Sequence, residues 1–226
     1  MSLTLKKSKS IGLVSLFVLS LFVAMVSTTP AVGAVNDTSS GTITGTETWT
    51  GVMNLDGDLL VAGGAKLIIN AGTTINIPAN RNIQIQGSIC AGDAFCGATQ
   101  ASTGSPIRFI WSEPGAAAPN QTGRCYVTGV FNPDMACGSG IYLASTIDQS
   151  LTRMNHVTID GAYGIPVDID GQGTIKYGAM VFDGASLSVS NPSFRDVNTS
   201  NVLAFGGASP TFDGGTFEVG VDAQGY

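Results

Sequence analysis

Four short apolar pairs recur at a fixed spacing between Gly57 and Gly87. Each pair begins eight residues after the one before it: Leu59/Val61, Leu67/Ile69, Ile75/Ile77 and Ile83/Ile85. Side chains alternate between the two faces of a β-strand, so each pair places two apolar residues on one face. The Gly, Asn and Pro residues between the pairs are typical of turns. The stretch therefore predicts short strands joined by corners, without helices.

Three of these units give a repeat of about 24 residues, and three strands per coil of this length are typical of a three-sided parallel β-solenoid. Its coils stack about 4.8 Å apart. The predicted corners are Gly63-Gly64, residues 70–72 and residues 78–80. The pair Ile107/Phe109 follows Ile83/Ile85 by one repeat of 24 residues. We therefore expect Ile107/Phe109 to stack on Ile83/Ile85 in the next coil.

The rhythm returns near the end of the chain, where a slightly shorter repeat predicts Val189 over Phe212 and Phe194 over Phe217. An antiparallel sandwich also has short, evenly spaced strands. It would favour tight turns such as Asn-Gly, whereas the connectors here read AGGA, NAGT and PANRN. We therefore predict an all-β fold, a right-handed parallel β-helix with coils of about 23–24 residues.

The N-terminal segment 1–34 has the pattern of a secretory signal peptide. Three lysines precede an apolar run from Ile11 to Val26, and Val32-Gly33-Ala34 offers a small-residue cleavage site. This run of 16 residues is shorter than the roughly 20 that span a bilayer, so we expect cleavage rather than retention as an anchor. The chain has no second apolar run of this kind, so we expect a secreted or cell-surface protein without a transmembrane segment.

The charge balance argues against nucleic acid as a partner. Removing the signal leaves seven basic and sixteen acidic residues, a net charge of −9. A field of this sign repels phosphate backbones.

The remaining chain divides into a Thr/Ser-rich lead-in with a first strand at 35–50 and a β-helix domain at 51–226. Two segments rich in Gly, Ala, Pro and Asn, at 90–105 and 113–137, interrupt the rhythm and are expected to project as loops. The sequence ends in GTFEVGVDAQGY without a recognisable cap. Open coils invite association, so we expect either an incomplete β-helix or end-to-end self-association through this last coil.

Four cysteines in an exported chain suggest two disulfides. Sequence proximity favours Cys90 with Cys96 and Cys125 with Cys137, although four cysteines allow three connectivities. A metal site is disfavoured because the chain has no CxxC motif and a single histidine, His156.

The stretch from Trp49 to Trp111 contains WTGVMNLDGDLLVAGGAKLIINAGTTINI, IQGSICAGD and SPIRFIW. It resembles the first coils of secreted right-handed parallel β-helix proteins, which include pectate-lyase-like folds and repeat proteins of microbial cell surfaces. A weaker resemblance covers His156 to Phe217. The resemblance to this group implies a core of stacked aliphatic side chains. The resemblance does not identify a function, because lyases, hydrolases, adhesins and passive surface proteins all have this fold.

Lyases of this fold use aspartates around calcium and a basic residue, and hydrolases use converging carboxylates. The candidate residues here are Asp160, Asp168, Asp170, Asp183 and Asp196, with Arg153, Lys176 and Arg195 as candidate bases. Most of the aspartates precede glycine, as do Asp56 and Asp213, which predicts turns in which the glycine has a positive φ. The chain lacks Asp-Asp, Gly-His-Gly and Arg-x-Lys segments, so no catalytic residue is assigned from the resemblance.

Three weaker signals remain. Asp168 and Asp170 are candidate ligands for a weakly held calcium ion, although the other ligands of a calcium loop are missing. His156 is expected at a strand surface or core edge. Asn36, Asn120 and Asn198 match the N-glycosylation pattern.

Together these features predict an exported, non-catalytic β-helix protein without a required cofactor. It would serve as a stalk, an adhesin-like module or a scaffold that contacts an extracellular glycan or surface protein. The alternative is a polysaccharide lyase or glycoside hydrolase of the same fold.

Overall fold

The strands of this chain pair almost entirely in parallel and form three sheets that the chain visits in turn. The computed structural model describes residues 37–38, 41–112, 126–127, 130–131, 138–169, 172 and 174–218. The architecture is a right-handed, three-sided parallel β-helix, as the sequence predicts. Within the described part of the chain, no helix has the length and apolar character needed to cross a membrane.

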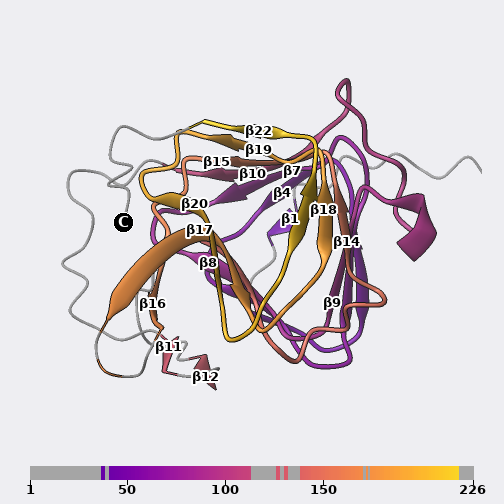
Figure 1. Ribbon diagram of the computed structural model, residues 1–226. Helices are drawn as coiled ribbons and strands as arrows, with labels where there is room; N and C mark the ends of the chain where they lie inside the picture. The colour runs from indigo at the N-terminus through magenta and orange to yellow at the C-terminus, as the bar shows by residue number, and fades with distance from the viewer. Residues whose placement is uncertain are drawn as a thin grey trace, which may run out of the picture. The chain divides into compact units, whose positions relative to one another are not determined.

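Sheet A has seven strands and occupies the top of Figure 1, where β10, β15, β19 and β22 lie one above another. In stacking order its strands are β1 (Asp37–Thr38), β4 (Val52–Asn54), β7 (Thr74–Ile77), β10 (Ile107–Trp111), β15 (Val157–Asp160), β19 (Ser193–Arg195) and β22 (Thr216–Phe217).

Sheet B contains the longest strand, β17, and lies toward the left of Figure 1. Its parallel strands are β2 (Gly41–Ile43), β5 (Leu59–Val61), β8 (Asn82–Ile85), β13 (Gly140–Leu143), β17 (Ile175–Asp183) and β20 (Ser200–Phe205).

Sheet C has six strands and lies on the right of Figure 1. Its strands are β3 (Thr46–Trp49), β6 (Lys66–Ile69), β9 (Ser88–Ala91), β14 (Arg153–Asn155), β18 (Ser188–Ser190) and β21 (Thr211–Asp213). The first coil therefore starts inside the predicted lead-in, since β2 and β3 already pair with β5 and β6.

The segment between Gly57 and Gly87 forms one complete turn of the coil. β5, β6 and β7 belong to sheets B, C and A, and β8 then pairs with β5, so that Ile83 stacks on Leu59 and Ile85 on Val61. The three predicted corners lie between these strands. Two of them contain a glycine with a positive φ, 80° at Gly64 and 74° at Gly72.

Inward side chains repeat in register from coil to coil and form the core. The strand partners of sheet B give one column of apolar residues: Leu59, Ile83, Ile141, Met180 and Val202. Its first four members are buried, and burying each such side chain contributes about 1.5–3 kcal/mol. The shorter repeat late in the chain is confirmed as well, with Val189 paired with Phe212 and Phe194 with Phe217.

The predicted stacking of Ile107/Phe109 one coil beyond Ile83/Ile85 is wrong. Phe109 pairs with Ile75 in sheet A, whereas Ile83 and Ile85 lie in sheet B below Ile141 and Leu143. The reason is the connection at 92–106, which follows β9 and lengthens the corner before β10. Later strands are therefore displaced from a strictly constant repeat.

Sheet B also contains an antiparallel arm. β16 (Ile165–Asp168) pairs antiparallel with the first half of β17. Ile165 and Val167 of this strand are buried in a second apolar cluster with Tyr142 and Val181. β16 therefore forms a hairpin arm with β17 rather than a further parallel strand of the coil. A second antiparallel pair, β11 (Tyr126–Val127) with β12 (Val130–Phe131), lies within the predicted loop at 113–137.

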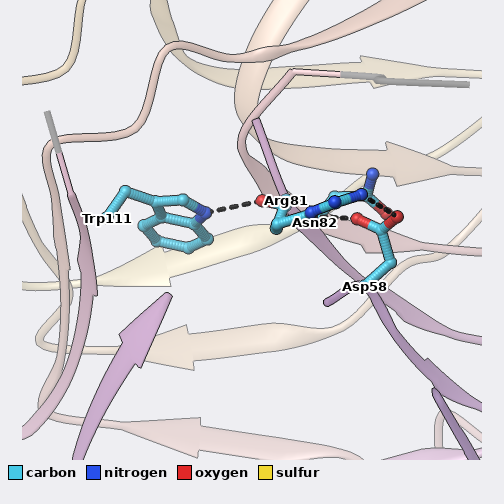
Figure 2. Close-up of polar contacts among 4 residues, drawn as sticks. All are labelled: Asp58, Arg81, Asn82 and Trp111. Carbon is cyan, nitrogen blue, oxygen red and sulfur yellow. Dashed lines mark hydrogen bonds and ion pairs between the residues drawn. The ribbon is translucent and has the colours of Figure 1, made fainter. Parts of the chain in front are cut away.

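Polar contacts join successive coils at the corner between sheets A and B, as Figure 2 shows. The Asp58 carboxylate accepts a hydrogen bond from the Asn82 backbone N–H (2.9 Å) and lies 3.4 Å from Nη1 of Arg81. The Arg81 carbonyl in turn accepts a hydrogen bond from Nε1 of Trp111 (2.7 Å). Three successive coils are thereby fixed at one corner.

Candidate functional site

A loop at residues 92–106 connects β9 to β10 and contains the short 3₁₀ turn η2 (Ala94–Cys96). The turn projects from the sheets beyond β14, as Figure 1 shows in magenta at the right. A disulfide between Cys90 and Cys96 ties the turn to β9, which confirms this pairing. Cys125 and Cys137 lie outside the described residues.

Hydrogen bonds inside the turn fix its backbone. Asp93 caps the turn, since Oδ1 accepts from the Phe95 N–H at 2.8 Å. The Ala94 N–H donates to Oε1 of Gln100 at 3.2 Å, and the Gly97 N–H donates back to the Ala94 carbonyl. Capping side chains of this kind satisfy backbone donors that a short turn leaves open.

Further contacts hold the loop on the preceding coil. Thr99 exchanges two hydrogen bonds of 2.8 Å with the corner after β6: its N–H donates to Oδ1 of Asn70, and its hydroxyl accepts from the Ala71 N–H. The Lys66 ammonium donates to the Cys96 carbonyl at 2.7 Å. The loop is therefore a fixed part of the fold.

This fixed turn holds an aromatic side chain in solvent. Phe95 is 81% exposed, and the guanidinium carbon of Arg153 lies 5.5 Å from the centroid of its ring. The position of Arg153 is itself set by bonds from Nη1 to the carbonyls of Gln149 (2.9 Å) and Thr152 (2.6 Å). An aromatic face beside a cation with several donors can contact a ligand through both apolar and polar groups.

A second cluster is charged and lies on the outer face of sheet A. Asp160 pairs with Arg195 of the next strand, and Arg108 lies on the strand before it. Burial raises the pKa of the Asp160 carboxyl, and the nearby Asp196 raises it further, while Arg195 and Arg108 act in the opposite direction. An acid whose pKa is raised beside cations is a candidate for proton transfer.

The other predicted catalytic residues do not join this cluster. Asp168 lies in β16 and Lys176 in the facing part of β17. Asp183, at the end of β17, accepts a hydrogen bond from the Tyr142 hydroxyl at 2.5 Å. Arg153 belongs to sheet C and contacts Phe95. Of the predicted set, the described structure brings together Asp160, Arg195 and Asp196.

The calcium candidates are only partly described. Asp168 is 5% exposed in β16, and Asp170 lies outside the described residues. Across the residues that the structure describes, no group of three or more His, Cys, Asp or Glu side chains is placed to hold a metal ion.

The aspartate–glycine turns are mostly as predicted. Gly161, Gly184 and Gly214 have φ values of 72°, 63° and 72°. The Asp56-Gly57 prediction is wrong, because Gly57 is not among the glycines with positive φ. Gly171 lies outside the described residues.

Among the weaker candidates, His156 and Asn198 lie at corners within the described residues. His156 lies at the corner before β15 with a φ of 48°, and its Nδ1 is 2.9 Å from Oδ1 of Asn155. It is half-buried between β14 and β15, which agrees with the core-edge alternative of the prediction rather than with the strand surface. Asn198 is exposed between β19 and β20, while Asn36 and Asn120 lie outside the described residues.

Two contributors were not found from the sequence. Phe95 is the one large apolar residue in a loop of small and polar residues, and its one signal was the short spacing of the two cysteines around it. Arg108 was missed because its place opposite Thr158, two residues before Asp160, depends on a strand register that the insertions shift.

No family model, curated protein or solved structure matches the chain. The strand pairing itself therefore defines the class, a three-sided parallel β-helix with projecting loops.

Proposed function

We propose that the chain is an exported, non-catalytic β-helix protein of the pectate-lyase-like type that acts at the cell surface. It serves as a stalk or adhesin-like scaffold, and its projecting loops contact an extracellular glycan or surface protein. The proposal needs no cofactor, with Asp168 and Asp170 kept as candidate ligands for a weakly bound calcium ion.

One observation carries this proposal. The disulfide and the surrounding hydrogen bonds hold the turn at residues 94–96 outside the coils, with Phe95 facing solvent. A loop that is already ordered loses little conformational entropy when it binds. A stack of coils with a packed core is a rigid support for such a loop.

Two further features support export. The segment 1–34 has the order of a secretory signal, and a structural disulfide is typical of oxidising compartments. Both features agree with a secreted or cell-surface location.

The alternative, a polysaccharide lyase or hydrolase, is favoured by Asp160. Its carboxyl has a raised pKa and lies on an outer sheet face, opposite Arg195 of β19 and within electrostatic range of Arg108 on β10. A long polymer could lie along such a face, with Asp160 as the acid that donates a proton.

Incubation of the purified full chain with neutral and acidic polysaccharides, with and without calcium, separates these functions. The scaffold proposal predicts no increase in reducing ends and no unsaturated products. Cleavage that is lost in Asp160→Asn, Asp168→Ala or Asp170→Ala would contradict it. Circular dichroism of each variant controls for folding.

A further inference from the structure

We propose that Phe95 and Arg153 form a binding site for a neutral polysaccharide. This inference rests on the proposed scaffold function and names the class of its ligand. A pyranose stacks one face on the phenyl ring, and its hydroxyls accept hydrogen bonds from the guanidinium.

The exposure of Phe95 sets it apart. Among the described residues, the other exposed large apolar side chains are 37–44% exposed, compared with 81% for Phe95. Single exposed apolar residues are common on proteins. Here, however, the chain fixes the residue in place: Oδ1 of Asp93 accepts a hydrogen bond from the Phe95 backbone N–H, and the neighbouring Cys96 is disulfide-bonded to Cys90.

The disulfide acts on the geometry of the turn. Its two cysteines are six residues apart, and closing so short a loop stabilises the fold by about 2 kcal/mol, less than closing a long one would. It also holds the backbone on both sides of Phe95 against β9. A preformed aromatic contact of this kind reduces the entropy that binding costs.

The chemistry of the pair matches a sugar ring. A pyranose has an apolar face of C–H groups and a rim of hydroxyls. The face of a phenyl ring carries negative potential, so it attracts polarised C–H groups as it does cations. Among the described residues, both hydrogen bonds of Arg153 use Nη1, and a guanidinium has five N–H donors, so donors remain there for sugar oxygens.

The charges around the turn favour a neutral ligand. Two cations contact the turn, Lys66 at the Cys96 carbonyl and Arg153 at the Phe95 ring. Asp93 lies within the loop, and Asp148 precedes the residues that hold Arg153. Hydrogen bonding from Ser150 lowers the pKa of Asp148, which keeps that carboxylate ionised. The four charges balance, and the mature chain carries −9, so a polyanion gains no attraction here.

Affinity electrophoresis of the purified full chain tests the site. The gels contain soluble β-glucan, xyloglucan or galactomannan as neutral probes, or polygalacturonate as the acidic probe. We expect retardation by at least one neutral polysaccharide and none by polygalacturonate. Phe95→Ala should weaken polysaccharide binding at least about 10-fold, the loss expected when an aromatic residue at the centre of an interface is truncated. Phe95→Trp should retain polysaccharide binding. Arg153→Ala should also weaken binding.

Leu151→Ala is the matched control, because Leu151 is a partly exposed apolar residue two positions before Arg153. It should leave retardation unchanged, and the thermal midpoint of Phe95→Ala should match that of the wild type. Retardation by no neutral polysaccharide, by polygalacturonate alone, or equally in Phe95→Ala would overturn the inference. Phe95-dependent binding of a protein without retardation by glycans would also overturn it. Cleavage products in the polysaccharide incubation would instead contradict the scaffold function. The effect of Phe95→Ala on retardation would still test the binding site.

Discussion

The carboxylate of Asp58 accepts a hydrogen bond from the backbone N–H of Asn82, 2.9 Å away on the next coil (Figure 2). The same carboxylate lies 3.4 Å from Nη1 of Arg81, and its side chain is 12% exposed. Asp58 therefore satisfies a backbone donor at the corner between sheets A and B, where the chain is between strands.

Asp58→Ala should lower the free energy of unfolding by about 1–3 kcal/mol, because the Asn82 N–H loses its acceptor. Asp58→Asn keeps an acceptor oxygen and loses mainly the exposed ion pair, so its cost should be under about 1 kcal/mol. Urea titrations of both variants measure the difference. Equal losses in the two variants would show that the ion pair, not the backbone bond, matters.

Gln84 offers a stabilising substitution. Its side chain is fully buried, and among the described residues neither atom of its amide group has a hydrogen-bond partner. Gln84→Met keeps the approximate volume and removes the unpaired polar atoms, so it should raise the free energy of unfolding by about 1–2 kcal/mol. Gln86→Met, at a half-buried neighbouring position, is the control and should change stability little. A loss of stability in Gln84→Met would contradict the burial argument.

The Cys90–Cys96 disulfide should stabilise its loop more than the whole fold. The Cys90→Ala/Cys96→Ala protein should lose about 2 kcal/mol and become sensitive to proteolysis within residues 92–106. Cleavage sites located by mass spectrometry, with oxidised wild type as the control, check this. Cleavage spread evenly over the coils would contradict a local role.

The raised pKa of Asp160 predicts a pH dependence of stability. Burial and Asp196 raise that pKa above its ordinary value of 3.8, so the folded state holds this proton more tightly than the unfolded state. The contribution of the group to stability is therefore present at low pH and is lost as the pH rises from 3.8 through the folded pKa. Asp160→Asn should have a higher thermal midpoint than wild type at neutral pH and the same midpoint below that window. A benefit confined to acidic pH would reverse the sign and refute the assignment.

The sequence predicted the coil where the chain is uninterrupted. An even repeat keeps the same strand face inward, so Ile83 stacks on Leu59 as expected. Val189 and Phe212 also pair as predicted, but their spacing of 23 residues is odd, so that prediction came from aligning the two similar segments. Apolar periodicity is enough here because every side of the coil buries the same kind of residue.

The insertions are where sequence reasoning failed. The sequence does not show at which corner of the coil the loop before β10 is inserted. A constant repeat of 24 residues therefore placed Phe109 in sheet B, whereas it pairs with Ile75 in sheet A. Alternation of apolar residues also does not distinguish parallel from antiparallel pairing, and β16 forms a hairpin arm.

The candidate sites depend on these same features. Asp160, Arg108 and Arg195 are far apart in the sequence and lie on neighbouring strands only because β10, β15 and β19 pair in register. The exposure of Phe95 follows from the turn geometry, which the spacing of Cys90 and Cys96 hinted at but did not specify.

A continuous parallel stack underlies both candidate sites, and spin-label distances can measure it directly. Val52, Arg108 and Thr216 lie in one outward column of sheet A, with Thr74 between the first two and Thr158 and Ser193 between the last two. Labels at Val52 and Arg108 are two strand steps apart, and labels at Val52 and Thr216 are five. At about 4.8 Å per step, pulsed electron spin resonance should give separations near 10 Å and 24 Å. A distance for the Val52/Thr216 pair no longer than that for the Val52/Arg108 pair would contradict the stack.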